Sequence, residues 1–343
     1  MPLPDFAAFL TIDEEACSAV ATALENQVAR QDSSFARDVA AGLTHPLLKE
    51  ISSSWLYDEL GSVLFEAITL LPEYGLTRAD ERVIQRAAPV LAATVGANPF
   101  VAELGSGSGK KTRAILSEFL LSGAAGYAPI DVSLSALEGC CAPLAALEGL
   151  ALHPTVGSYL DGLALALRRR EPGQRALLLF LGSTIGNFAR EELPGFLTGV
   201  RKLLDVGDYF LVGADLEKSP SVLELAYDDP VGVTAAFNKN LLAHLNTAFA
   251  GDFDLGLFAH RAVYNLAERR IEMYLESTAR QRVTLRDLDL RIALEAGERI
   301  RTEFSHKFNL PELRQLATLS GFAPGQEWCD TEWPFAECLW RAE

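Results

Sequence analysis

The chain has 343 residues, of which 49% are apolar, and this is enough to fill one large core or two ordinary ones. Its 46 acidic and 30 basic residues give a formal net charge of −16, which repels a phosphate backbone and argues against a nucleic-acid partner. The five cysteines, two adjacent and none in a CxxC pair, predict free thiols in a reducing compartment and no metal site.

Targeting signals are not evident in the sequence. The N-terminal segment MPLPDFAAFLTIDEEACS lacks a basic region followed by an apolar stretch, so we predict no signal peptide. Apolar runs such as LLLFLG are far shorter than a membrane span, so no membrane partner is expected. We therefore expect a cytoplasmic protein, and we take a monomer as its expected state.

Residues 1–95 carry helical patterns. Within residues 56–74, apolar side chains recur at three- and four-residue spacing, which predicts an amphipathic helix that ends at Pro72. A second helical pattern follows Thr77. The apolar positions of the two patterns are Leu60, Leu64, Ile68 and Leu71, then Val83, Ile84 and Leu91.

From residue 100 the pattern changes to short apolar strands that alternate with helices. Residues 100–104 predict a strand that enters the glycine-rich turn 105–109, and residues 111–121 then have helical periodicity. Further strands are predicted at residues 127–133, in the apolar run before 182–187, and at 207–216. This alternation predicts an α/β fold whose parallel sheet, over about 100–217, is covered on both faces.

Residues 218–306 lose this alternation. A loop entering a helix is predicted from residue 227, and polar–apolar alternation then predicts antiparallel strands up to residue 308. A helix with a glycine stop follows Asn309, and residues 327–343 predict a closing hairpin. The α/β pattern is therefore interrupted by an insert and resumed at the C-terminus.

The glycine-rich turn is the first candidate binding element. Gly105, Gly107 and Gly109 follow a strand and open a helix, where backbone approaches a ligand closely and positive φ is common. The spacing excludes a phosphate-binding P-loop, and Lys110 stands where a dinucleotide motif needs its third glycine. The E-x-G-x-G turn of S-adenosylmethionine enzymes and a turn without ligand remain, and Glu103 together with Asp131 favours the former, because a carboxylate after the next strand can accept both ribose hydroxyls.

A second candidate element is the loop GSTIGN at residues 182–187. It follows an apolar strand, and ligands of open α/β sheets bind beyond the carboxyl ends of the strands. Its polar groups, Asn187 included, can bind a carboxylate or an amine; a polar turn that caps the next helix is the alternative. Glu303 and Ser305 lie two apart on a predicted strand and therefore share one face.

Taken together, these segments resemble one family, the histidine-specific Nα-methyltransferases of ergothioneine biosynthesis. The resemblance covers about residue 35 to the C-terminus, and the combination of LPEY, GSTIGN and YDDPxGVTAAFN is highly specific. The segments that carry it are LYDELGSVLFEAIT-LPEY-TR (56–78), ELGSGSGKKTR (103–113), YAPIDVS (127–133), GSTIGN (182–187), AYDDPVGVTAAFNKN (226–240), RIEM (270–273) and RTEFSHKF (301–308).

The resemblance implies a Rossmann-like class I methyltransferase sheet and a second, α+β substrate-binding domain. The substrate-binding domain would comprise residues 1–79 and 218–306, and the methyltransferase domain residues 80–217 and 307–343. The implied cofactor is S-adenosyl-L-methionine, with no metal, and the implied partner is a small-molecule amino-acid substrate. The residues implied for cofactor binding are Gly105, Gly107, Lys111, Asp131, Ser158 and Tyr159.

The resemblance also assigns the substrate side. Asn187 and Tyr227 would hold the substrate carboxylate and amine, and Tyr57 would lie near the amine, so these three are the implied catalytic residues. Tyr74, Glu303 and Ser305 would recognise the imidazole, and Met273 and Gly182 would line the same pocket. The implied reaction transfers methyl groups to the α-amino nitrogen of L-histidine, up to the trimethylated betaine, hercynine.

Two positions depart from the family pattern. Gly75 stands where a second aromatic residue usually follows LPEY, and Ser158 replaces an acid near the adenine. The first can reshape the substrate pocket, so an N-methyltransferase of the same fold acting on another amino acid or small amine is the alternative. A catalytically idle relative is a further hypothesis, which retention of both motif sets argues against, and a nicotinamide oxidoreductase is the remaining competitor of the same fold type.

Overall fold

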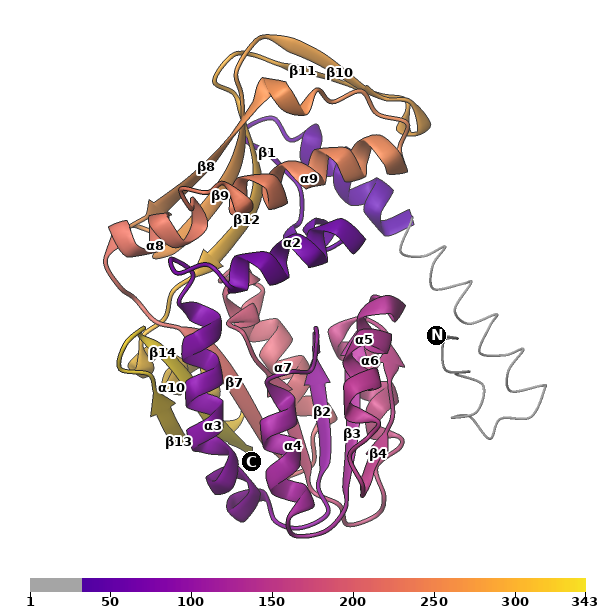
Figure 1. Ribbon diagram of the computed structural model, residues 1–343, viewed down its shortest axis with the longest axis vertical. Coiled ribbons are helices and arrows are strands. Elements are labelled where there is room, and N and C mark those ends of the chain that lie inside the picture. The colour runs from indigo at the N-terminus through magenta and orange to yellow at the C-terminus, as the bar shows by residue number, and fades with distance from the viewer. Residues whose placement is uncertain (1–32) are drawn as a thin grey trace, which may run out of the picture.

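The computed structural model describes residues 33–343 (Figure 1). Predictions for residues 1–32, including the first part of the N-terminal helical pattern and Cys17, lie outside the described residues. Residues 33–43 are helical, as predicted. A short strand, β1 (Lys49–Glu50), and a 3-10 turn, η2 (Ser53–Leu56), come next, and neither was predicted.

A mostly parallel sheet forms the lower half of the molecule in Figure 1. Its central strands β3, β2, β6 and β7 pair in parallel in this order, and the antiparallel hairpin of β13 and β14 continues the sheet beyond β7. The strands are β2 (Phe100–Leu104), β3 (Ala125–Asp131), β4 (Leu150–Leu152), β5 (Thr155–Val156), β6 (Ala176–Phe180), β7 (Tyr209–Asp215), β13 (Phe322–Cys329) and β14 (Phe335–Ala342).

Helices cover both faces of this sheet. Every residue of β2 and β6 is buried, as expected of strands with a helix layer on each side. One apolar core joins the sheet to α3 (Leu76–Val95), α4 (Thr112–Leu120) and α5 (Leu134–Leu144); the other joins it to α6 (Tyr159–Leu167), α7 (Leu193–Leu203) and α10 (Leu310–Leu319). The predicted α/β fold with a doubly covered parallel sheet is confirmed.

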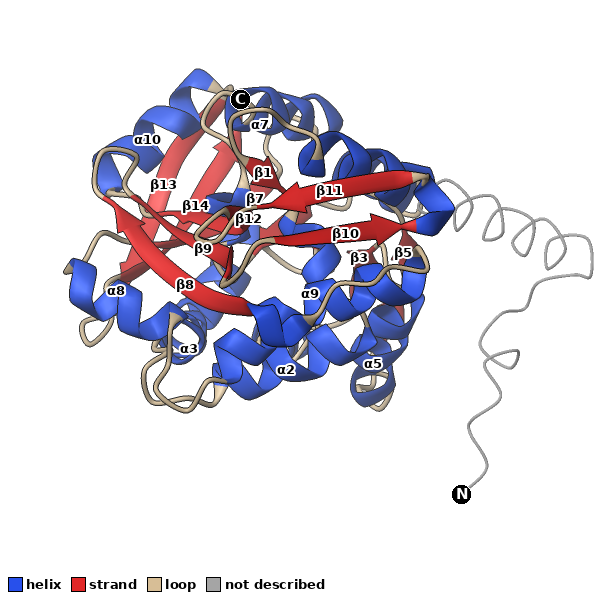
Figure 2. Ribbon diagram, turned by 90° about the horizontal axis from the view of Figure 1, so that it is seen from above, coloured by secondary structure: helices blue, strands red, loops and turns tan. Residues whose placement is uncertain are grey.

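A second sheet lies above the carboxyl ends of these strands (Figure 1). It is four-stranded, and β10 and β11 form a separate ribbon, seen from above in Figure 2. The helices α2, α8 and α9 pack against it around a third apolar core. The elements are β8 (Phe258–Asn265), β9 (Arg270–Ser277), β10 (Gln281–Leu285), β11 (Leu290–Leu294), β12 (Arg299–His306), α2 (Glu59–Thr69), α8 (Pro220–Tyr227), α9 (Val233–Ala248), η4 (Leu255–Leu257) and η5 (Arg286–Leu288).

Helix α3 connects the two halves. Its first turns, through Leu76, Ala79 and Val83, belong to the upper core, whereas Ile84 and the residues after it belong to the lower one. The predicted domain boundary between residues 79 and 80 therefore falls inside a continuous helix. The division into two domains stays a prediction.

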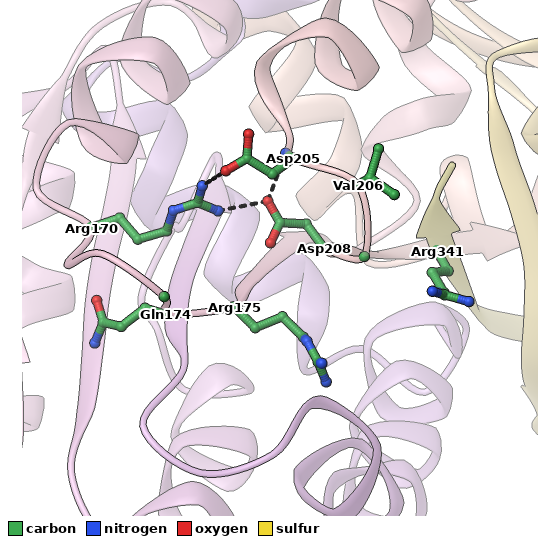
Figure 3. Close-up of a pocket in the computed structure, with 9 residues that line it drawn as sticks. Arg170, Gln174, Arg175, Asp205, Val206, Asp208 and Arg341 are labelled. Atoms are coloured by element: carbon green, nitrogen blue, oxygen red, sulfur yellow. Dashed lines mark hydrogen bonds and ion pairs between the residues drawn. The ribbon is translucent and has the colours of Figure 1, made fainter.

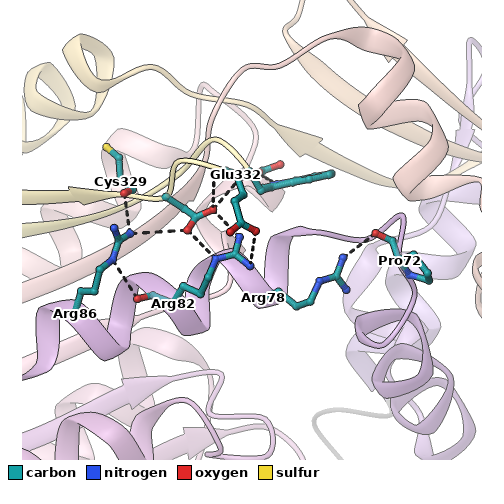
Figure 4. Close-up of polar contacts among 9 residues, drawn as sticks. Pro72, Arg78, Arg82, Arg86, Cys329 and Glu332 are labelled. Atoms are coloured by element: carbon teal, nitrogen blue, oxygen red, sulfur yellow. Dashed lines mark hydrogen bonds and ion pairs between the residues drawn. The ribbon is translucent and has the colours of Figure 1, made fainter.

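Some element boundaries differ from the predictions. Helix α2 ends at Thr69 instead of Pro72, because a residue that precedes proline disfavours the helical conformation. The Arg78 guanidinium donates to the carbonyl oxygens of Leu71 and Pro72, at 2.8 and 2.7 Å, and so supports the turn that follows (Figure 4). Strand β13 of the closing hairpin begins earlier than predicted, at Phe322.

In the described part of the chain Cys140, Cys141 and Cys338 are buried free thiols, and Cys329 is a half-buried one. Residues 33–343 contain no cluster of three histidine, cysteine, aspartate or glutamate side chains arranged to hold a metal ion. No helix within the same range has the length and apolar character needed to cross a membrane.

Candidate active site

The glycine-rich turn lies between β2 and α4, at the carboxyl end of the sheet. Gly105, Gly107 and Gly109 have φ of 67°, 51° and 64°, so the positive φ predicted from the sequence is present at all three. Gly105 and Gly107 are exposed, and a Cβ at Gly107 would meet no atom within 4 Å. A Cβ at Gly109 would instead lie 2.6 Å from the Cys140 Sγ, so this glycine serves packing.

Asp131 and Tyr159 lie beside this turn. Asp131 ends β3, and its carboxylate accepts the Ser133 backbone N–H at 2.9 Å. Burial raises the pKa of Asp131, while the backbone N–H groups of Ser133, Val132 and Gly107 oppose the rise. A Cβ at Gly105 would lie 3.6 Å from the Tyr159 hydroxyl, and burial together with the Asp131 charge raises the pKa of Tyr159 to about 12. Gly105, Asp131 and Tyr159 therefore border one space.

Ser158, at the N-terminus of α6, has a different environment. Its side chain is exposed, and its hydroxyl donates to the Asp161 carboxylate at 2.9 Å. Asp161 thus supplies an acid in the first turn of α6, three residues after the position where the sequence pattern lacks one.

Lys111 links the glycine-rich turn to the loop 182–187. Its ammonium forms an ion pair with the fully buried carboxylate of Asp80, from α3. The same Asp80 oxygen accepts the Gly182 backbone N–H at 3.0 Å. Although burial opposes it, the Asp80 charge raises the pKa of Lys111. The Gly182 N–H is therefore bound to a carboxylate of the protein. Through this carboxylate, Asp80 joins α3, the glycine-rich turn and the loop 182–187, which are distant in the sequence.

The loop 182–187 turns directly against the end of β12. Ser183 adopts a left-handed conformation, with φ of 61°, and residues Thr184–Asn187 form the 3-10 turn η3. A Cβ at Gly186 would lie 2.8 Å from the His306 carbonyl oxygen and 3.2 Å from the Ser305 Oγ. Only glycine allows this contact, which brings the half-buried Asn187 next to the strand that carries Glu303 and Ser305.

Aromatic side chains form one wall of the space above β12. The rings of Tyr74 and Tyr227 lie 5.9 Å apart, and Tyr57 packs against Phe65 and Phe237 at 5.4 and 5.5 Å. Burial raises the pKa of Tyr57 well above its ordinary value, and the Glu303 charge and the hydroxyls of Tyr74, Tyr227 and Tyr159 add to the rise. Tyr57 therefore lies near the predicted substrate-binding residues and also near Tyr159, which borders the glycine-rich turn.

Glu303 carries a carboxylate that no described residue of the protein satisfies. It lies on β12 opposite Met273 of β9, just after a β-bulge. Within residues 33–343 no group donates a hydrogen bond to this carboxylate. Burial raises the pKa of Glu303 to about 7, although the Lys307 charge opposes the rise. The site thus presents an acceptor without a protein donor.

Below Glu303 lies a group of buried charges that we call the Asp215 cluster: Asp215, Lys218 and Lys307. Asp215 and Lys307 are fully buried, and the Lys307 Nζ lies 3.0 Å from the Asp215 Oδ2. The Lys218 Nζ donates to the other carboxylate oxygen at 2.6 Å. Although burial opposes it, the two ammonium groups hold the pKa of Asp215 below its ordinary value.

Trp333 closes this cluster from the hairpin between β13 and β14. Its indole N–H donates to the Asp215 Oδ1 at 2.9 Å, and the Lys218 Nζ lies 4.7 Å from the ring centroid. Asp330, in the same hairpin turn, pairs with Arg82 of α3 and accepts the Trp333 backbone N–H. A Cβ at Gly75 would lie 2.2 Å from the Trp333 ring. Trp333 therefore occupies the space that Gly75 leaves.

A cavity of about 370 Å³ lies elsewhere (Figure 3). It is lined by residues that precede β6 and β7, and so lies at the amino ends of these strands. Ligands of such sheets bind at the carboxyl ends. Its Asp208 also has structural partners, Arg170 and the Ala176 backbone N–H. We therefore place the active site at the carboxyl ends.

The glycine-rich turn fits S-adenosylmethionine. Its exposed backbone at positive φ leaves open the volume that side chains would fill, and a carboxylate and an aromatic ring border the same volume. A ribose diol needs such an acceptor, and a sulfonium is attracted to carboxylates and aromatic faces.

A family model described as histidine-specific, S-adenosylmethionine-dependent methyltransferases matches residues 35–342. The chain belongs to this family. The resemblance inferred from the sequence is therefore confirmed, as are the Rossmann-like class I fold and the identification of the protein as an enzyme that uses S-adenosylmethionine as methyl donor.

Curated relatives agree with the family match. The chain is 38% identical over 305 residues to histidine N-alpha-methyltransferase of Mycobacterium tuberculosis, covering 88% of this chain and 93% of the relative. It is 30% identical to ergothioneine biosynthesis protein 1 of Neurospora crassa, covering 82% of this chain and 32% of that protein. It is 25% identical to an L-tryptophan methyltransferase of Psilocybe serbica, covering 84% and 87%.

Among solved structures, a DUF574 family protein from Streptomyces avermitilis aligns with a TM-score of 0.46 and 10% identity, covering 85% of this chain and 95% of that one. A Burkholderia thailandensis 1,6-didemethyltoxoflavin-N1-methyltransferase aligns with a TM-score of 0.40 and 13% identity, covering 82% and 88%.

The structure thus brings the predicted cofactor and substrate residues to one end of the sheet, with the buried Met273 beside Glu303 on the neighbouring strand β9. Sequence reasoning missed Asp80, Asp215, Lys307 and Trp333. One signal for Lys307 was available, because it continues the two-residue spacing of Glu303 and Ser305. Asp80 and Trp333 gave no such signal, since an acid on a helix and an aromatic residue in a turn are ordinary.

Proposed function

We propose that this protein transfers methyl groups from S-adenosylmethionine to the α-amino nitrogen of L-histidine, up to the trimethylated betaine, hercynine. The observation that supports histidine is the Glu303 carboxylate, which no described residue satisfies and which shares its strand face with the Ser305 hydroxyl. Glu303 is half-buried, and a ligand that covers its carboxylate must supply a hydrogen-bond donor, which an imidazole N–H provides. The histidine N-alpha-methyltransferase relatives support the same assignment.

The cofactor side of the proposed site consists of Gly105, Gly107, Lys111, Asp131 and Tyr159, with Ser158 at its edge. Gly105 and Gly107 would let the methionine part of the cofactor approach the backbone, and Asp131 would accept the ribose hydroxyls. Lys111 already pairs with Asp80, so its contribution would be to fix the turn and add positive charge.

The substrate side consists of Asn187 and Tyr227 for the carboxylate and amine, and Tyr74, Glu303 and Ser305 for the imidazole. Met273 and Gly182 would line this pocket, and Tyr57 would face the amine. A dimethylated amine has fewer hydrogens to donate, so the carboxylate contacts and the aromatic faces of Tyr57 and Tyr227 would carry more of its binding.

S-adenosylmethionine supplies an electrophilic methyl group on its sulfonium. The residues of the chain then need to hold an unprotonated amine in line with that group, and such alignment can lower a barrier by roughly 7–11 kcal/mol. The amine must first lose a proton, either to water or to Tyr57 or Tyr227. Both phenols stay protonated, since the pKa of each is raised above its ordinary value. Water would therefore take the proton, and the two hydroxyls would orient the neutral amine.

Mass spectrometry tests this function. The full chain is incubated with S-adenosylmethionine and each of the twenty amino acids, and the products are fragmented to locate the added methyl groups. We expect successive methylation of histidine on the α-nitrogen. Preferential methylation of another amino acid, or of the imidazole, would refute the assignment.

A second acceptor class has one specific observation in its favour. Trp333 lies against Gly75 at the edge of the upper core, so this pocket is shaped differently from one with an aromatic residue after LPEY. The distant L-tryptophan methyltransferase relative supports an aromatic amino acid as the alternative acceptor. The amino-acid panel described above discriminates between the two.

We also propose the two-domain division at residues 79/80, 217/218 and 306/307, a cytoplasmic location and a monomeric state. The separate cores of the two sheets support the division. The free buried thiols support a reducing compartment. Light scattering coupled to gel filtration tests the monomer.

A further inference from the structure

Lys307 is a fully buried ammonium with three oxygen neighbours. It follows the last residue of β12, and its Nζ donates to the Tyr227 Oη at 3.1 Å and to the Ser305 Oγ at 3.0 Å. The third neighbour is the Asp215 Oδ2, at 3.0 Å. An ammonium group has three N–H donors and no acceptor. Two of the Lys307 donors are therefore used by hydroxyls of the protein, and its charge is paired with the Asp215 carboxylate.

These contacts determine what the two hydroxyls can do. A hydroxyl has one O–H donor and two acceptor lone pairs, and an isolated one can present either character to a ligand. Because Lys307 donates to the oxygen of both Tyr227 and Ser305, it occupies an acceptor position on each and polarises each O–H. The hydrogen of each hydroxyl is then directed away from Lys307, toward a ligand acceptor or toward a neighbouring hydroxyl, since Tyr227 lies within hydrogen-bonding reach of Ser305 and Tyr74.

The substrate side offers two such acceptors, if the proposed function holds. A substrate carboxylate beside Tyr227 accepts its O–H, and a neutral imidazole has one unprotonated nitrogen that accepts the O–H of Ser305. The other imidazole nitrogen carries a hydrogen, which matches the unsatisfied carboxylate of Glu303. The strand thus presents an acceptor at Glu303 and a donor at Ser305.

We infer that Lys307 is a positioning residue that fixes the hydroxyls of Tyr227 and Ser305 as hydrogen-bond donors, and thereby makes the pocket select a side chain that carries both a donor and an acceptor. This inference rests on the proposed function. It adds a residue outside the implied substrate set, acting through Ser305 and Tyr227 without touching the substrate.

The Asp215 cluster provides the matched control. Lys218 donates to the same carboxylate as Lys307, but its other contacts are the Leu216 carbonyl oxygen and the Trp333 ring. Substituting either lysine by methionine removes one positive charge from the same cluster. Only the Lys307 substitution also releases the two hydroxyls.

The test compares wild type, Lys307→Met, Lys218→Met, Ser305→Ala and the Lys307→Met/Ser305→Ala double variant. Turnover of histidine and of phenylalanine gives the preference, as a ratio of kcat/KM values. For Lys307→Met we expect the histidine KM to rise about 10- to 100-fold and the histidine preference to fall by a similar factor. S-adenosylhomocysteine affinity, measured by calorimetry, should stay unchanged, and Lys218→Met should keep the preference.

The double variant should lose no more preference than the worse of the two single variants, since both act on one hydroxyl. If Lys307→Met does not fold by circular dichroism, Lys307→Gln replaces it; its amide keeps donors but adds an acceptor, and we expect it to lose preference while it folds. A wild type that does not methylate histidine overturns the proposed function. If the wild type does methylate histidine, two results overturn the role of Lys307 alone. One is a folded Lys307 variant with unchanged histidine preference, and the other is a Lys218→Met variant with the same loss of preference.

Discussion

The two sides of the active site are built in different ways. The cofactor side depends on backbone conformation within one short segment, Gly105 to Gly109, together with a carboxylate at the end of the next strand. The substrate side depends on side chains that the fold gathers from α8, β7, β12 and the C-terminal hairpin. The first can therefore be read from a contiguous motif, whereas the second exists only after folding.

This difference has a consequence for substitutions. Cofactor binding should respond to changes at the glycine-rich turn and at Asp131, and substrate binding should respond to changes in charge and packing around Asp215 and Glu303. Lys111 and Asp80 join the two sides, because the Asp80 carboxylate binds both the Lys111 ammonium and the Gly182 N–H. The predictions below test how separable the sides are.

Asp131→Ala should have the largest effect. It removes the acceptor for two ribose hydroxyls, and hydrogen bonds to a charged group contribute roughly 1.5–3 kcal/mol each, so we expect S-adenosylhomocysteine affinity to fall at least about a hundredfold. Calorimetry measures this affinity, and the melting curve controls for folding. Unchanged affinity in the folded variant would mean that Asp131 does not bind the cofactor.

Glu303→Ala should impair substrate binding and leave cofactor binding intact. The imidazole N–H loses its acceptor, so kcat/KM for histidine should fall about a hundredfold while S-adenosylhomocysteine affinity keeps its wild-type value. Steady-state kinetics with histidine and calorimetry with the cofactor product separate the two effects. Histidine turnover at the wild-type rate would show that the imidazole is bound elsewhere.

Gly75→Ala should disturb the substrate side indirectly. The new Cβ would lie 2.2 Å from the Trp333 ring, so the indole must shift and weaken its hydrogen bond to Asp215. We expect a loss of about 1–3 kcal/mol in the free energy of unfolding and a several-fold increase in the histidine KM. Gly139→Ala in α5 is the control, because a Cβ there meets no atom within 4 Å. Equal effects of the two substitutions on urea unfolding would contradict this account of Trp333.

The smallest effect concerns stability and pH. Burial raises the pKa of Glu303 from 4.5 to about 7, so the folded state holds this proton more tightly than the unfolded state. The resulting contribution to stability is present in full below pH 4.5 and is lost as the pH rises through about 7. Glu303→Gln should therefore be more stable than wild type at pH 8, on the order of 1 kcal/mol, and equally stable at pH 4. Urea unfolding at both pH values measures the difference, and a variant less stable at pH 8 would contradict a destabilising carboxylate.

The sequence predicted much of the fold because its signals are local. The all-apolar strand Ala176–Phe180 and the glycines at positive φ each needed only neighbouring residues to be recognised. Glu303 and Ser305 shared a face by their spacing, and the family resemblance supplied their implied partners.

The rest depended on contacts between distant segments. Lys307 and Asp215 are 92 positions apart in numbering, and nothing in either segment indicates that their charges are buried together. Trp333 contacts Gly75 from the opposite end of the chain. Asp80 has the sequence context of an exposed acid on a helix, and only the packing of α3 against the loop 182–187 shows that it is buried.

The central claim is that a methyl donor on the glycine-rich turn and a histidine held by β12 face each other in one cavity. A crystal structure of the full chain with S-adenosylhomocysteine and histidine tests it most directly. We predict the α-amine in line with the cofactor sulfur, the carboxylate at Asn187 and Tyr227, and the imidazole between Glu303 and Ser305. Histidine bound away from β12, or a cofactor bound away from Gly105 and Asp131, would contradict it.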